Sequence, residues 1–169
     1  MRRLLYPLIA ATAIALAIAS FAPPNAGLAQ QEPRAADAAP VPYSPGMGDL
    51  MSILIQPRHV KLWLAGHQEN WPLAGYALKE IKQSLARIAA GIPHHNGAPV
   101  ADLIESAVGS QIGLVDFAIK AGEPRQFTEQ YGRLTAGCNS CHVSTGHPYI
   151  VIKVPDGAAF ANQEFQPKR

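Results

Sequence analysis

Three side chains near the end of the sequence have the types and spacing needed to hold a metal cofactor. They lie in the segment Cys138-Asn139-Ser140-Cys141-His142, which contains both cysteines of the chain. Two thiols three residues apart share one face of a helix, and the next residue adds an imidazole. This C-x-x-C-H spacing is the attachment signature of c-type haem. We therefore expect one covalent haem c, bonded through Cys138 and Cys141, with His142 as an axial iron ligand.

Other uses of a cysteine pair fit the sequence less well. A thioredoxin-like C-x-x-C expects a βαβ context, which the sequence pattern does not show. A structural zinc site needs about four ligands, usually from two such pairs. A structural disulfide would explain the two cysteines in an exported protein, but it would not require His142.

The N-terminal segment predicts export to the periplasm. Arg2 and Arg3 precede an apolar run from Leu4 to Ala22, and small residues follow as far as Ala29. This layout is typical of a secretory signal peptide over residues 1–29, cleaved after Ala29. The alternative is an uncleaved membrane anchor, which Pro7 and the small-residue exit disfavour.

Beyond the signal, the pattern predicts a linker and one helical domain. Residues 30–45 are rich in Ala and Pro without apolar periodicity, which predicts a linker. In the domain, residues 46–169, apolar side chains recur every three or four positions and predict helices over 46–65, 70–90, 100–122 and 124–145. The stripe of the second helix is Ala74, Ala77, Leu78, Ile81, Leu85 and Ile88. Pro57 predicts a kink or a restart within the first helical segment. Asn70 is the expected N-cap of the second helix, and Gly66 and Gly122 are the expected stops of the first and third segments. We expect an all-α, up-and-down four-helix bundle with an extended C-terminal tail.

The place of the motif suggests a family. It ends the last predicted helix, and no Met follows His142. In both respects the chain resembles the class II cytochromes c, the cytochrome c-prime type, over about residues 46–145. It is more closely similar to a group of small exported haem proteins, and the shared segments are Arg58-His59, Lys61-Leu62-Trp63, Asn70-Trp71, Leu73-Ala74, Tyr76, CNSCH, Tyr149-Ile150-Val151-Ile152, Asn162-Gln163 and Phe165. The resemblance implies a haem-binding bundle, which in class II proteins often dimerises, so a homodimer is one option. The tail after Gly146 departs from cytochrome c-prime.

A second axial ligand is expected from the first helical segment, because the end of helix four lies beside the start of helix one in such a bundle. His59 is the leading candidate, Met51 the alternative and Met47 the weakest, while an open distal site is the fourth option. Arg58 could pair with a haem propionate. His94 and His95 are predicted to form an exposed pair in a loop, and His147 is predicted to be exposed in a turn, with an approach to the propionates as its alternative.

The expected function is one-electron transfer at iron with a redox partner protein that the sequence does not identify. An open site would instead bind or sense a diatomic gas, and a peroxidase is the weakest alternative because no distal acid–base group is visible. The balance of 14 Lys+Arg against 12 Asp+Glu argues against a nucleic-acid-binding protein.

Overall fold

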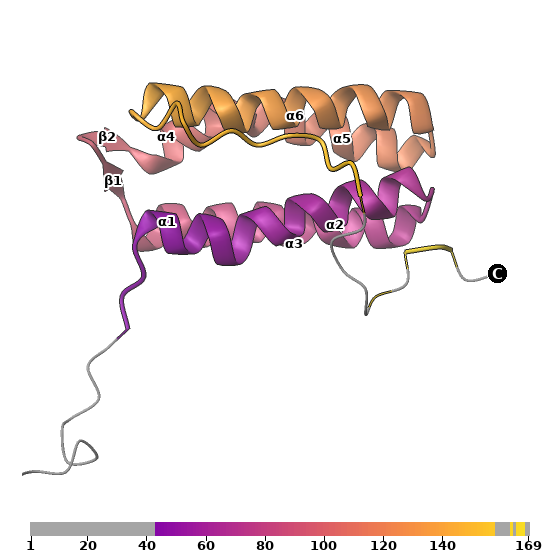
Figure 1. Cartoon of the computed structure of the whole chain (residues 1–169), viewed down its shortest axis with the longest axis horizontal. Coiled ribbons are helices and arrows are strands. Elements are labelled where there is room, and N and C mark those ends of the chain that lie inside the picture. Colours follow the sequence, from indigo (N-terminus) through magenta and orange to yellow (C-terminus); the bar gives the residue numbers. More distant parts are fainter. Residues whose placement is uncertain (1–42, 158–162, 164, 168–169) are drawn as a thin grey trace, which may run out of the picture. The chain divides into compact units, whose positions relative to one another are not determined.

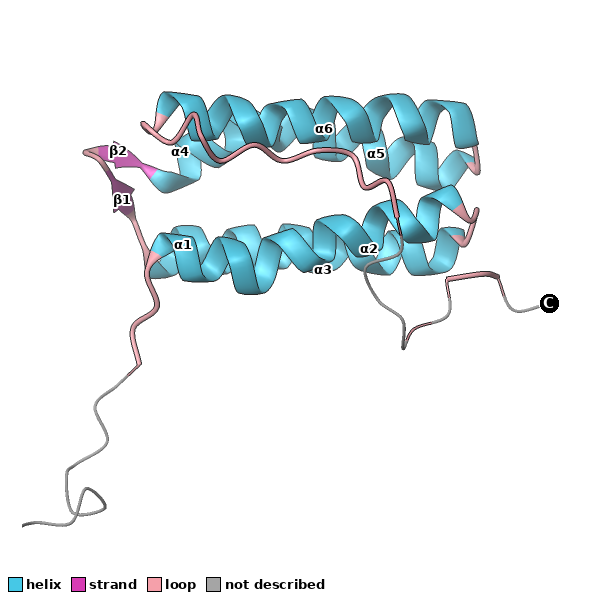
Figure 2. Cartoon of the chain, viewed as in Figure 1, coloured by secondary structure: helices cyan, strands magenta, loops and turns pink. Residues whose placement is uncertain are grey.

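The computed structural model describes residues 43–157, 163 and 165–167, and these residues form an all-α protein (Figure 1). Helices account for most of the chain between Met47 and Ser144, and the only sheet in the described part has two short strands (Figure 2). The prediction of an all-α fold is confirmed. The predicted signal peptide, residues 1–29, and most of the predicted linker lie outside the described residues.

The first helical segment contains α1 (Met47–Leu50), a π-helical turn (Met51–Ile55) and α2 (Gln56–His67). The sequence predicted a kink or a restart at Pro57, and α2 begins at this point, at Gln56, with Pro57 in its first turn. The wider π-turn lies directly before Pro57, whose missing backbone N–H cannot join the helical ladder. The new α-helical piece follows the π-turn without a loop between them, and α2 ends beside the predicted stop at Gly66.

The second segment is α3 (Trp71–Gly91), and it follows the prediction closely. The side-chain oxygen of Asn70 accepts a hydrogen bond from the Leu73 amide at 3.3 Å, which is the expected N-cap. All six residues of the predicted apolar stripe are buried, and Ser84 is buried beside them. The i, i+3, i+4 spacing thus identified the inward face of this helix correctly.

A hairpin joins α3 to the next helix, where the sequence predicted an irregular loop. Strand β1 (His94–His95) pairs antiparallel with β2 (Ala98–Pro99). Asn96 and Gly97 form the turn with φ angles of 51° and 81°. Positive φ at both turn residues is the geometry that Asn-Gly favours in a two-residue hairpin.

The last two segments complete the helical fold. The third contains α4 (Val100–Ile104), a second π-helical turn (Glu105–Gly109) and α5 (Ser110–Ala121). It ends at Gly122, whose φ of 67° gives the expected left-handed stop. The fourth is α6 (Pro124–Ser144), whose last turns carry the C-x-x-C-H segment.

The four segments pack side by side around one apolar core. Helix α2 contacts α3 and α6, and α5 contacts α3 and α6 (Figure 1). Rings from three segments meet at one end, where Trp63 lies 5.0 Å from Tyr131 and Trp71 lies 5.9 Å from Phe127, measured between ring centroids. Phe165, beyond the last helix, is also buried in this core, so the tail packs against the helices there.

Candidate cofactor site

The two cysteines lie on the last turns of α6 as free thiols. Burial, reinforced by the neighbouring Cys141, raises the pKa of Cys138 to about 11. Burial also raises the pKa of Cys141. Both groups are therefore neutral near pH 7, whereas a thiol-exchange site needs a depressed thiol pKa. This chemistry disfavours a thioredoxin-like role for the pair.

The imidazole of His142 is held in one tautomer by the tail. Its Nδ1 lies 2.9 Å from the carbonyl oxygen of Ile150. A carbonyl can only accept a hydrogen bond, so Nδ1 carries the proton and donates it. In the neutral ring Nε2 then keeps its lone pair, which is the form that binds a metal, and the Nδ1–H bond orients the ring.

Asn139, the first variable residue of the C-x-x-C-H motif, fixes the same stretch of tail, residues 150–152. The side-chain amide of Asn139 donates to the Ile152 carbonyl at 2.8 Å and accepts from the Ile152 amide at 2.7 Å. This pair of bonds sets the backbone of residues 150–152 against α6. The acceptor for His142 is thereby positioned by a residue from inside the C-x-x-C-H segment.

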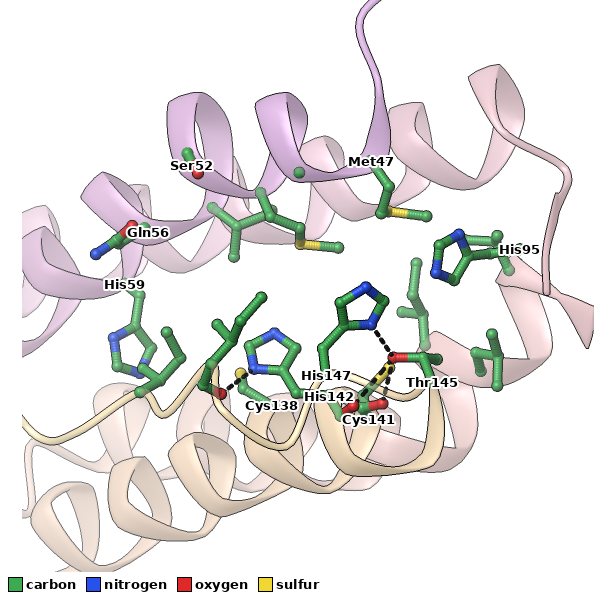
Figure 3. A pocket seen from close by; sticks show the side chains of 18 residues that line it. Met47, Ser52, Gln56, His59, His95, Cys138, Cys141, His142, Thr145 and His147 are labelled. Carbon is green, nitrogen blue, oxygen red and sulfur yellow. Dashed lines mark hydrogen bonds between the residues drawn. The ribbon is translucent and has the colours of Figure 1, made fainter.

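A pocket with a cavity volume of about 230 Å³ opens beside the motif (Figure 3). It is walled by Met47, Gly48, Met51, Ser52, Ile55, Gln56, His59, His95, Val100, Leu103, Ile104, Cys138, Cys141, His142, Thr145, His147, Ile150 and Ile152. No Asp, Glu, Lys or Arg of the described residues is among these wall residues. The wall therefore combines a largely apolar surface with two thiols and the imidazole of His142, whose Nδ1 is already bonded to the tail.

Met47 and Met51, both predicted as candidate ligands, line the wall formed by α1 and the π-turn. Figure 3 shows the Met47 side chain across the pocket from His142. π-Turns are often found at functional sites because they change which side chains face inward. Here the turn begins at Met51 and also contributes Ser52 and Ile55 to the wall.

His59, the leading predicted second ligand, also lines the pocket, but both of its ring nitrogens have partners. Nδ1 lies 2.8 Å from the hydroxyl of Tyr131, and Nε2 lies 3.0 Å from the hydroxyl of Thr135. The two hydroxyls also lie 2.9 Å from the carbonyls of His59 and Tyr131 respectively. Ligation by His59 would break one bond of this buried network.

Burial lowers the pKa of His59 to about 4, so the ring is neutral at pH 7. The neutral ring and the two hydroxyls carry three protons for the four contacts. One of the four contacts must therefore be left without a proton, and a second ring proton on His59 would supply it. The loss of hydration on burial opposes that protonation, and we expect the neutral form to prevail at pH 7.

Arg58, predicted to face a propionate, does not line this pocket. Its guanidinium donates to the Leu54 carbonyl at 2.7 Å and lies 3.7 Å from the Glu80 carboxylate. Arg58 and Glu80 line a second, more polar pocket between α2 and α3. The structure thus brings Cys138, Cys141 and His142 together with the methionines but leaves Arg58 on another face.

Sequence reasoning missed Asn139, and it placed His95 and His147 in exposed loops. The structure places both histidines in the pocket wall, half-buried, with their ring centroids 5.8 Å apart. The neighbouring His94 is exposed, as predicted. The Asn96-Gly97 dipeptide is a hairpin signal that could have distinguished the two neighbours, because adjacent strand residues point to opposite faces.

Comparison of the chain with protein-family models, with curated proteins and with solved structures gives no match. Within the described residues, no group of three or more His, Cys, Asp and Glu is placed to hold a metal ion by itself. None of the helices in the described part of the chain is long and apolar enough to cross a membrane.

Proposed function

We propose that the protein is an exported c-type cytochrome that carries one covalent haem and transfers single electrons. The observation that carries the proposal is the hydrogen bond from His142 Nδ1 to the Ile150 carbonyl, at 2.9 Å. It leaves the Nε2 lone pair available at a pocket whose wall also holds both neutral thiols. Thioether bonds would form at Cys138 and Cys141, and His142 would ligate the iron.

The pocket residues fit a haem on chemical grounds. An apolar macrocycle requires an apolar wall, and this wall is formed mainly by Met, Ile, Val and Leu side chains. When bound, haem supplies a one-electron iron couple whose potential depends on the axial ligands and the surrounding polarity. The chain itself orients His142 through the tail, and α1 and the π-turn form one wall of the pocket.

For the distal side we favour Met51 over His59. The His59 ring is already bonded to Tyr131 and Thr135, whereas the Met51 thioether lines the pocket without such partners among the described residues. Methionine as the second ligand gives a higher reduction potential than histidine. An electron carrier of relatively high potential follows from this assignment.

The proposal includes the finer features expected from the sequence. It takes the packed helices to be an up-and-down four-helix bundle of the class II type, with a C-terminal tail that follows α6. It places the mature protein in the periplasm, because the N-terminal segment has the layout of an export signal. The redox partner would be another protein, and a homodimer is compatible with the class II resemblance.

The absorption spectrum of the reduced protein, with and without carbon monoxide, tests the proposal. The protein is produced in a host that attaches c-type haem. We expect a six-coordinate, low-spin spectrum that carbon monoxide changes only slowly or partly, because Met51 occupies the distal position. Immediate and complete conversion by carbon monoxide would instead show an open site and a gas-binding protein. A colourless product from such a host would reject the haem assignment itself.

A further inference from the structure

Two histidines from distant parts of the chain meet at one end of the pocket. His95 belongs to β1, and His147 follows α6 in the tail. Their rings are stacked at 5.8 Å with an interplanar angle of 30°. Figure 3 shows His95 toward the end of the pocket opposite His59.

This pairing is built into the backbone. The side-chain amide of Asn96, in the hairpin turn, donates to the Thr145 carbonyl at 3.0 Å. The His147 amide donates to the His142 carbonyl at 2.7 Å, which sets the position of its ring beside the motif. Two separate elements are therefore held so that both imidazoles face the same space.

The two rings have hydrogen-bonding capacity that the described residues do not use. The ring of His95 makes no hydrogen bond with any described residue. His147 has only one, at the 3.5 Å limit, between Nδ1 and the Thr145 hydroxyl. Each neutral imidazole has one N–H to donate. Because no Lys or Arg lies in the pocket wall, these rings are the strongest candidates there to satisfy an anion.

A haem brings two carboxylates, on its propionate side chains, into any pocket that it fills. A carboxylate taken out of water without donors is costly, so it is normally hydrogen-bonded. Arg58, whose guanidinium was expected to pair with a propionate, lies on another face and pairs with Glu80. The pocket therefore needs another hydrogen-bond donor for these carboxylates. The stacked imidazoles of His95 and His147 lie in its wall and can donate.

We propose that His95 and His147 form the propionate-binding site of the cofactor, each donating a ring N–H to a carboxylate. This inference rests on the proposed function. It explains why His95 and His147 are fixed in the pocket wall by the Asn96 side chain and the tail backbone. Neither histidine is assigned a bond to iron.

The test uses the haem-loaded protein and three matched variants: His95→Phe, His147→Phe and His94→Phe. Phenylalanine keeps a ring for stacking but removes the N–H donor. Resonance Raman spectra report the propionate bending vibrations, and a redox titration gives the midpoint potential. We expect His95→Phe and His147→Phe to shift the propionate band and to lower the potential. The lower potential follows because an unbonded carboxylate leaves more negative charge near the iron and favours its oxidised state.

His94→Phe is the control, because His94 is the exposed neighbour on the same strand. It should leave both readouts at their wild-type values. His95→Gln and His147→Gln retain an N–H donor and should restore part of the shift, and they replace the Phe variants if those fail to fold.

Three outcomes would overturn the inference. Unchanged propionate bands and potentials in proteins with normal haem content would show that the rings do not bind the carboxylates. A change of spin state in either variant would show that the histidine binds iron instead. Equal shifts in the His94 control would show a general effect of the hairpin. Absence of covalent haem in the wild-type protein would instead reject the proposed function, and the intact mass distinguishes that failure from the others.

Discussion

The ring of His142 and the carbonyl of Ile150 are joined by a hydrogen bond of 2.9 Å between Nδ1 and oxygen. The two residues lie eight positions apart, one at the end of α6 and the other in the tail that returns along it (Figure 1). Through this bond the tail sets the tautomer and the orientation of the His142 imidazole in the C-x-x-C-H segment.

Replacing Asn139 should release the tail from α6. Asn139→Ala removes both hydrogen bonds to Ile152, one of which leaves a partly buried backbone amide without its partner. We expect the free energy of unfolding to fall by about 1–3 kcal/mol, measured by urea denaturation. Asn139→Asp keeps the hydrogen-bond acceptor and removes only the donor, so the free energy of unfolding should fall by less than in Asn139→Ala. Midpoints equal to wild type for both variants would contradict the role of this residue.

Two variants distinguish Met51 from His59 as the second iron ligand. Met51→Ala should convert the reduced protein from low-spin to high-spin, because it removes the favoured thioether. His59→Ala should leave the low-spin spectrum intact while lowering stability, because it breaks the buried network with Tyr131 and Thr135. The reverse pattern, with the spectrum lost only in His59→Ala, would assign the iron bond to His59.

The buried His59 predicts a pH dependence of stability. Its pKa is about 4 in the folded protein and about 6.5 in the unfolded chain. Between these values the unfolded chain binds more protons, so the free energy of unfolding decreases as the pH falls. Unfolding curves at pH 7 and pH 4 should differ by about 3 kcal/mol from this group.

His59→Gln should flatten that pH dependence, whereas His67→Gln should keep it. His67 lies on the same helix but is exposed, so it makes a matched control. If the free energy of unfolding changes equally with pH in the two variants between pH 4 and pH 7, a group other than His59 causes the acid instability.

The glycines of α6 test how closely the motif helix must approach its neighbour. A Cβ on Gly137 would collide with the Ala107 carbonyl oxygen and would lie 3.1 Å from Val108 Cγ1. Gly137→Ala should therefore cost about 1–3 kcal/mol of stability. A Cβ on Gly132 would meet nothing within 4 Å. Gly132→Ala should instead stabilise the helix by about 0.5–1 kcal/mol, and thermal unfolding of both variants measures the difference.

Gly137→Ala also changes the position of Cys138, the next residue. We expect incomplete haem attachment in this variant, seen as a mixture in the intact mass. Full attachment together with unchanged stability would show that α6 does not need this close approach to the second π-turn.

The sequence predicted those features that depend on local periodicity or on a local cap. The stripe of α3, the Asn70 cap and the stop at Gly122 are of this kind, and each is present. The two π-turns were not predicted, because one extra residue in a turn hardly changes an i, i+3, i+4 pattern.

The site could be predicted only where its residues are neighbours in the chain. Cys138, Cys141 and His142 form one motif, so their type and spacing were enough. The bonds of Asn139 to Ile152 and the stacking of His95 on His147 join residues far apart in sequence. No periodicity records such pairs, since they depend on how the tail and the hairpin return to the end of α6.

The most direct measurement is the intact mass of the secreted protein after denaturation, combined with labelling of its thiols. If haem is held as we propose, the denatured chain keeps the added mass of one haem, and neither Cys138 nor Cys141 reacts with an alkylating reagent. If the denatured chain has its bare polypeptide mass and takes up two labels after reduction, no covalent haem is present and the account is wrong.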